Sequence, residues 1–431
     1  MAVIAQNDNV TSTYTEGQNY TKPFIVITCL FFMWAVITNI NDILIPHLKK
    51  ACELTDFQSS LVQFAFFIAY FLMSIPSGFI INKMGYKGGM ILGLMVMVAG
   101  ALLFIPAALS LNYALFLIAL FVLGSGVTLL QVAANPYVTL LGKPETSSTR
   151  LNLAQAFNSL GATLGPYVGG ALILSGVEYS VSEWASLSEA QQMQFRLKEA
   201  ASVIVPFSGI AAALLVLALV IYFSKLPIIE TKTESGKKEA LSGTAWKFSH
   251  LTLGVLAIFL YVGAEVSIGS FLIRFAGMPE IANLKDIDAK IYPSMYMLGA
   301  MIGRFIGSAL LTKVSPSKAV AFNACAAAFL LIVGIFTKGY TALIVVTLVG
   351  LFNSIMFPTI FTLGVAGLGR FTKQGASFLI MAIVGGGIIP PLMGLVSGVK
   401  GIQFAFIVPI SCYIYILYYG LYGSKIKTRD I

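Results

Sequence analysis

Trp34-Ala-Val-Ile-Thr-Asn-Ile-Asn-Asp-Ile-Leu-Ile-Pro-His-Leu48 closes an apolar run that begins near Phe24. The run from Phe24 to Leu48 is long enough to cross a bilayer as a helix, yet Asn39, Asn41 and Asp42 stand where hydrocarbon side chains are expected. A carboxylate inside a membrane-spanning helix is costly and is retained where it faces a bundle interior or a water-filled cavity. We therefore interpret Asp42 as a functional residue of a membrane protein.

The composition of the whole chain agrees with this interpretation. Of 431 residues, 58% are hydrophobic and 10% are charged, and the mean hydropathy is +0.87. Apolar runs of about twenty residues recur from end to end, which excludes a soluble multidomain protein and the short alternating segments of a membrane β-barrel. The net charge of +9 is scattered over short loops, so membrane orientation explains it better than nucleic-acid binding. The sequence predicts an all-α membrane protein.

Twelve spans are predicted from these runs: 24–46, 58–81, 88–109, 112–141, 151–175, 201–223, 250–273, 290–311, 317–336, 340–368, 374–398 and 402–423. Residues 1–21 lack the pattern of a removable signal peptide and are expected to form a tail. With both termini in the cytoplasm, the inner face carries 17 of the 27 Lys and Arg residues and the outer face nine. This distribution obeys the positive-inside rule and predicts that orientation.

The two halves of the chain share residues at a nearly constant spacing. Pro136-Tyr-Val-Thr-Leu-Leu-Gly142 resembles Pro358-Thr-Ile-Phe-Thr-Leu-Gly364 at an offset of 222, and Asp42 and Glu265 differ by 223. A recurring offset predicts duplication. We expect two pseudo-symmetric six-helix bundles, residues 1–224 and 249–431, joined by a cytoplasmic linker at 225–248.

Several motifs resemble a known family. Gly78-Phe-Ile-Ile-Asn-Lys-Met-Gly-Tyr-Lys87, together with the twelve-span plan, is similar to the signature of the major facilitator superfamily, although Asn82 stands where an Asp is usual. The resemblance extends to the fucose, glucose and galactose permease branch through Asn39-Ile-Asn-Asp-Ile-Leu-Ile-Pro46, Ala133-Ala-Asn-Pro-Tyr-Val-Thr139, Leu151-Asn-Leu-Ala-Gln-Ala-Phe-Asn-Ser-Leu-Gly161, Tyr261-Val-Gly-Ala-Glu265, Gly303-Arg-Phe-Ile-Gly307 and Phe357-Pro-Thr-Ile-Phe361. Within that branch, Asn353-Ser-Ile-Met-Phe-Pro-Thr-Ile360 and Met381-Ala-Ile-Val-Gly-Gly-Gly-Ile-Ile-Pro-Pro391 look closest to bacterial glucose/galactose transporters.

This resemblance implies a cation-coupled hexose symporter of the bacterial inner membrane. Such a protein works by alternating access, as a monomer and without a cofactor other than its coupling ion. The family's coupling carboxylate falls on Asp42. Gln131 falls where proton-coupled fucose permeases carry a second carboxylate, and Glu265 falls where they carry an amide. These departures make sodium the favoured ion, with proton-coupled, fucose-type sugar symport as the alternative.

The polar residues of spans 1 and 4 suit a cation. Sodium prefers several oxygen ligands, and Asn39 with Asp42, three residues apart, and Gln131 with Asn135, four apart, each share one helical face. These four residues are our candidate coupling site. The alternative for Asn39 and Asn135 is that their amides only hydrogen-bond between helices, as polar residues in membranes often do.

Sugar recognition requires groups that pair with hydroxyls and cover apolar C–H faces. The candidates are amides, a carboxylate and an aromatic ring inside the spans: Trp34, Asn41, Gln155, Asn158, Glu265 and Asn353. The resemblance places the amides of span 5 at the central cavity. For Trp34, simple packing between helices is an equal alternative.

Three further residues are assigned to gating or structure. Arg304 lies in Gly303-Arg-Phe-Ile-Gly307, where the glycines let another helix approach closely, and it is expected either to pair with Glu265 or to cap carbonyls of a broken span 10. Gly385 and Pro390 weaken span 11 and permit bending or close packing. His250, at a span end, is expected to be exposed.

Other function classes fit less well. No pair of nucleophile and base, metal cluster or phosphate-binding loop supports an enzyme. An exporter of apolar cations from the same superfamily is the nearest rival, and hexoses would compete poorly with its substrates.

Overall fold

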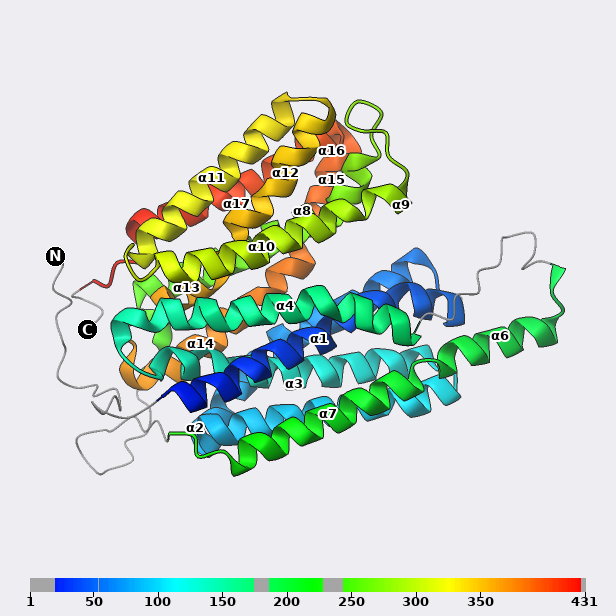
Figure 1. Cartoon of the computed structure of the whole chain (residues 1–431), viewed down its shortest axis with the longest axis horizontal. Coiled ribbons are helices and arrows are strands. Elements are labelled where there is room, and N and C mark those ends of the chain that lie inside the picture. The colour runs from blue at the N-terminus through cyan, green and yellow to red at the C-terminus, as the bar shows by residue number, and fades with distance from the viewer. Residues whose placement is uncertain (1–19, 53, 174–185, 228–242, 428–431) are drawn as a thin grey trace.

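The computed structural model describes residues 20–52, 54–173, 186–227 and 243–427, which contain helices and no strand (Figure 1). The first half comprises α1 (Thr21–Cys52), α2 (Asp56–Leu109), α3 (Tyr113–Leu140), α4 (Ser147–Ile173), α6 (Glu189–Ala201) and α7 (Ile204–Phe223). The second half comprises α8 (Ser249–Ala276), α9 (Asp286–Ala289), α10 (Ile291–Leu310), α11 (Pro316–Phe336), α12 (Gly339–Asn353), α13 (Met356–Val365), α14 (Thr372–Met381), α15 (Gly385–Lys400), α16 (Ile402–Ala405) and α17 (Ile407–Tyr418). The prediction of an all-α protein is confirmed.

Each of the twelve predicted spans falls on a helical segment as far as the chain is described; the last two residues of predicted span 151–175 lie outside the described residues. Predicted spans 2 and 3 join into the single helix α2, which is interrupted at Gly85, where φ is +74°. Glycine adopts this left-handed conformation without the penalty that a Cβ atom would bring. The connection between these two spans is therefore one residue of broken helix rather than a loop.

Spans 10 and 11 are irregular inside the bundle. The first is divided into α12 and α13 around Ser354 and Ile355, and the second changes from α14 to α15 through a 3₁₀ turn at Ala382–Val384. Breaks in transmembrane helices are tolerated where neighbouring groups satisfy the freed backbone. The break in span 10 leaves the carbonyl of Ser354 available to a side chain from another helix.

Equivalent glycines bring helices together in both halves. A Cβ atom on Gly161 of α4 would collide with the backbone oxygen of Phe32 on α1. Likewise, a Cβ atom on Gly385 of α15 would collide with the backbone oxygen of Phe259 on α8. Spans 1 and 5 thus pack as spans 7 and 11 do, as expected for a duplicated bundle.

We expect Gly385→Ala to destabilise the protein because neither backbone can yield to the added methyl group. The free energy of unfolding should fall by about 1–3 kcal/mol, the usual cost of overpacking. Gly398→Ala on the same helix is the matched control, because a Cβ atom there meets open space. Thermal unfolding in detergent, followed by tryptophan fluorescence, measures both variants. Equal melting temperatures for the two would contradict the close approach of α15 to α8.

The two halves contact each other near the end that is predicted to be cytoplasmic. Hydroxyl and amide groups of α4 reach α13, with Ser148 Oγ 2.7 Å from Thr362 Oγ1 and Asn152 Nδ2 donating to Thr359 Oγ1 over 3.1 Å. Ser308 of α10 donates to a backbone oxygen of α4 over 3.1 Å. Figure 1 shows α10 beside α4 and α14 beside α3, so the halves meet along these helices.

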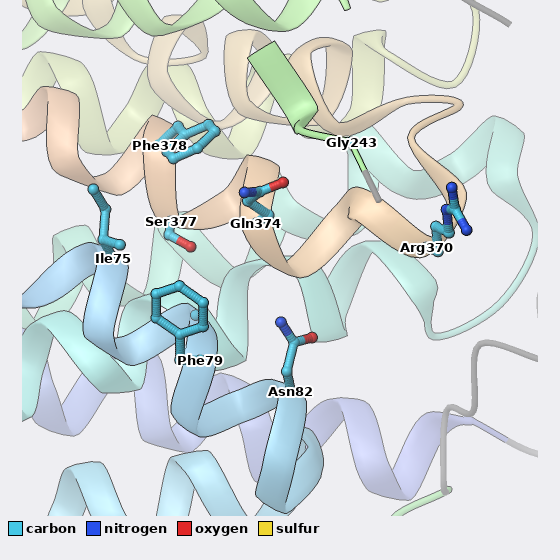
Figure 2. A pocket seen from close by; sticks show the side chains of 9 residues that line it. Ile75, Phe79, Asn82, Gly243, Arg370, Gln374, Ser377 and Phe378 are labelled. Atoms are coloured by element: carbon cyan, nitrogen blue, oxygen red, sulfur yellow. The ribbon is translucent and has the colours of Figure 1, made fainter. Parts of the chain in front are cut away.

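A cavity of about 160 Å³ lies in this contact between α2 and α14 (Figure 2). Its walls come from both halves of the chain: Ile75, Gly78, Phe79, Asn82, Gly243, Arg370, Gln374, Ser377 and Phe378. No residue of the predicted sugar or cation site lines it. Its opposite walls therefore belong to different halves.

The expectation that His250 is exposed is wrong. Its side chain is 0% exposed, and its Nε2 atom lies 2.8 Å from the carbonyl oxygen of Ala366. The residue sits in the first turn of α8, where the chain following α13 packs over it. A span end at this place is covered by protein rather than by water.

Candidate functional site

Three predicted amides of the first half lie together on α3 and α4. Gln131 Nε2 donates to the hydroxyl of Tyr70 on α2 over 2.9 Å, and Gln155 Nε2 lies 3.5 Å from Asn135 Oδ1. All three amide side chains are buried, at 8%, 6% and 0% exposed for Gln131, Gln155 and Asn135. The Nδ2 atom of Asn135 is buried without a hydrogen-bond partner in the described structure. This cluster therefore presents an unused donor.

The predicted residues of α1 divide into two groups. Asn39 Nδ2 donates to Ala35 O over 2.8 Å, and within the described chain its hydrogen bonds stay on α1, so none joins it to the amides of α3. Trp34 is 4% exposed, and its ring centroid lies 4.2 Å from that of Phe31, a geometry that favours packing. The side chains of Asn41 and Asp42 lie outside the described residues.

Asn158 connects α4 to α1 by donating from Nδ2 to the carbonyl oxygen of Phe31 over 2.9 Å. The side chain is partly exposed. Of the two amides predicted on span 5, Asn158 thus reaches α1 while Gln155 faces α3.

The second half contains a partly buried ion pair. Glu265 Oε1 of α8 accepts from the hydroxyl of Tyr261 over 2.7 Å and lies 3.8 Å from Arg304 Nη2 of α10. The side chains of Arg304 and Glu265 are 12% and 18% exposed. Arg304 also donates from Nε to the freed carbonyl of Ser354 over 2.9 Å. Both alternatives that the sequence leaves for Arg304 are therefore realised as contacts.

Asn353 is the centre of a tyrosine cluster. It is 0% exposed, its Oδ1 accepts from Tyr413 over 2.6 Å, and its Nδ2 donates to the hydroxyl of Tyr296. The Tyr261 hydroxyl lies 3.0 Å from its carbonyl oxygen. With its amide engaged on both sides, Asn353 positions the tyrosines around Glu265 instead of offering free groups to a cavity.

A polar contact joins the two halves beside this ion pair, next to the rings of Phe157 on α4 and Phe305 on α10, whose centroids are 5.8 Å apart. Arg304 Nη1 donates to the hydroxyl of Ser159 on α4, the residue that follows Asn158. Ser159 in turn donates to the carbonyl oxygen of Gln155 over 3.1 Å. The ion pair of the second half is thereby connected to the helix that carries the predicted sugar-binding amides.

Gly385 and Pro390 lie away from these polar groups. Gly385 is buried against α8, and Pro390 lies one turn later on α15 and is half-buried. Sequence reasoning missed several polar partners within the spans: Tyr70, Ser159, Tyr261, Tyr296, Ser354 and Tyr413. The spacing of Tyr261 four residues before Glu265 on one helical face could have indicated the first contact of that carboxylate.

Comparison with known proteins gives a consistent answer. The Major Facilitator Superfamily pattern matches residues 24–389. A protein of Brucella abortus named "Glucose/galactose transporter" is 48% identical over 426 residues, covering 99% of this chain and 100% of the relative. A protein of Helicobacter pylori named "Putative glucose/galactose transporter" is 45% identical and covers 93% of this chain and 96% of its own. The "L-fucose-proton symporter" of Escherichia coli K12 is 40% identical and covers 96% of each.

Solved structures agree with the sequence relatives. A crystal structure of the E. coli fucose:proton symporter superposes with a TM-score of 0.87 at 39% identity, covering 95% of this chain and 100% of the other. A structure of such a transporter in the outward conformation gives a TM-score of 0.88 with the same coverage. The predicted fold of twelve transmembrane helices in two pseudo-symmetric bundles is confirmed. The chain belongs to the Major Facilitator Superfamily.

Proposed function

We propose that this protein is a cation-coupled hexose symporter that carries glucose or galactose, with sodium as the favoured coupling ion. The observation that carries the proposal is a series of polar contacts that crosses both halves. It runs from the amides of α3 and α4 through Ser159 to the ion pair of Arg304 and Glu265. The names of the B. abortus and H. pylori relatives support the hexose assignment.

In this proposal Glu265, Gln155 and Asn158 bind the sugar. Tyr261 and Arg304 hold Glu265 Oε1, whereas no hydrogen bond engages Oε2 in the described structure. A carboxylate oxygen in this position accepts hydrogen bonds from sugar hydroxyls, and the amides of α4 both donate and accept. Asn41 remains a proposed sugar contact, Trp34 a packed wall, and Asn353 the support of this site.

Asp42 carries the coupling ion in this proposal. Gln131 Nε2 donates to Tyr70 and Asn39 Nδ2 donates to Ala35, and within the described residues no hydrogen bond is made to either amide oxygen. Both oxygens therefore remain acceptors for the cation that we propose Asp42 binds. Asn135, one turn after Gln131 on α3, remains a proposed ligand of this cation, with its Oδ1 atom 3.5 Å from Gln155 Nε2.

Proton-coupled sugar symport of the fucose type is the second candidate. The E. coli and Haemophilus influenzae relatives named "L-fucose-proton symporter" favour it, at 40% and 32% identity. Here Asp42 would alternate between a protonated and an ionised form, and Gln131 would only orient it. An exporter of other small molecules is the more distant alternative.

Transport is proposed to occur by rocking of residues 1–224 against 249–431, as a monomer with both termini cytoplasmic. The contacts between α4, α10 and α13 would close the cytoplasmic end, so this conformation would open to the outside. The match to a structure in the outward conformation supports this assignment. Gly385 and Pro390 would permit α15 to bend during the change of state, and residues 225–248 would link the halves.

Uptake into proteoliposomes tests the function. Labelled glucose is offered under an inward sodium gradient at fixed pH, and then under an inward proton gradient without sodium. We expect accumulation with sodium and competition by unlabelled galactose. Accumulation with protons alone would establish the second candidate, and neither accumulation nor exchange of any hexose would overturn the sugar assignment.

A further inference from the structure

Arg304 has partners in both halves of the molecule. Its three nitrogens meet Glu265 of α8, the Ser354 carbonyl at the break in span 10, and the Ser159 hydroxyl of α4. The first two partners belong to the second half and the third to the first. The planar guanidinium suits this arrangement because its donors point in fixed, separate directions.

Of the three contacts of Arg304, the one with Glu265 has room to shorten or lengthen. Its 3.8 Å separation is longer than a hydrogen bond, whereas the contact with Ser354 spans 2.9 Å. Sugar hydroxyls that donate to Glu265 would change how strongly the carboxylate attracts the guanidinium. That change reaches α4 through Ser159, which lies beside Asn158.

We propose that Arg304 is a positioning residue that couples sugar binding at Glu265 to the contact between the two halves at Ser159. This inference rests on the proposed function. Through Arg304, the free energy of sugar binding at Glu265 depends on the contact at Ser159, and the free energy of that contact depends on sugar binding. Such coupling between distinct sites must be reciprocal.

A second contact between the same two helices provides the control. Ser308 lies four residues after Arg304 on α10, and its hydroxyl donates to the carbonyl oxygen of Thr149 on α4 over 3.1 Å. Ser159 and Ser308 are both 5% exposed. Removing either hydroxyl therefore deletes one contact between the halves, but only Ser159 is connected to Glu265 through Arg304.

A double-mutant cycle measures the coupling. Glucose affinity is determined by isothermal titration calorimetry on the full chain for wild type, Ser159→Ala, Glu265→Gln and the double variant. Ser159→Ala is expected to weaken binding about fivefold in the wild-type background, a typical coupling factor, and less than about twofold when Glu265 is already glutamine. Ser308→Ala should change the glucose affinity by the same factor in the wild-type and Glu265→Gln backgrounds.

Two results would overturn the inference while leaving the function intact: an equal effect of Ser159→Ala in both backgrounds, or the same background dependence for Ser308→Ala. If Ser159→Ala does not fold, Arg304→Lys replaces it, because a single ammonium group cannot hold all three partners; it should also lose its effect in the Glu265→Gln background. A folded wild-type chain that binds no glucose, galactose or fucose overturns the function and this inference together.

Discussion

Replacing Asp42 by asparagine is expected to abolish accumulation of sugar against its gradient while preserving sugar exchange across the membrane. An amide can neither become an anion nor take up a proton at neutral pH, so the ion gradient loses its connection to the sugar. A carboxylate inside a span must be neutralised in part of the cycle by a proton or a cation, and asparagine removes this requirement. The variant should therefore lose accumulation of sugar completely rather than in part.

Two assays on the same proteoliposomes measure this effect. Ion-driven uptake of labelled glucose should fall to the level of empty liposomes, and counterflow against internal unlabelled glucose should remain. Asp288→Asn serves as a control because Asp288 is an exposed acid of the short helix α9, outside the spans. Concentrative uptake that survives in Asp42→Asn would remove Asp42 from the coupling role and leave Glu265 as the remaining carboxylate within the spans.

The arrangement of helices could be predicted from the sequence because local composition identifies membrane spans. Runs of about twenty apolar residues give the helices, and the offset between Asp42 and Glu265 gives the duplication. The close contacts of Gly161 and Gly385 follow from the same repeat. What local composition could not show is that Gly85 interrupts a helix that otherwise continues, since a loop and a single left-handed residue look alike in sequence.

The partners of the polar residues were harder to predict. The sequence predicts that Arg304 contacts either Glu265 or a broken helix, and the structure shows both contacts, together with one to Ser159 from the other half. The burial of Asn353 among tyrosines was missed because a tyrosine in a span is equally compatible with apolar packing. Such contacts depend on side-chain geometry between helices far apart in sequence, which no local pattern records.

Replacing Glu265 by glutamine is expected to weaken sugar binding and to destabilise the protein. Hydrogen bonds to a charged group contribute about 1.5–3 kcal/mol, so we expect glucose affinity to fall roughly 10- to 100-fold. The loss of the anion also leaves the partly buried guanidinium of Arg304 without a counter-charge. Removing one partner of a buried pair costs about 3–5 kcal/mol; the 3.8 Å separation and partial exposure place this case at the lower end.

Glu280→Gln is the matched control for this second variant, because Glu280 also forms an ion pair, with Lys338 at 2.9 Å, but both side chains are more than half exposed. Exposed pairs contribute about 0–1 kcal/mol, so neither glucose affinity nor the melting temperature in detergent should change appreciably. If Glu265→Gln lowers the melting temperature without changing affinity, the carboxylate serves only to balance Arg304. If it lowers affinity alone, other groups compensate the guanidinium, and the sugar contact stands by itself.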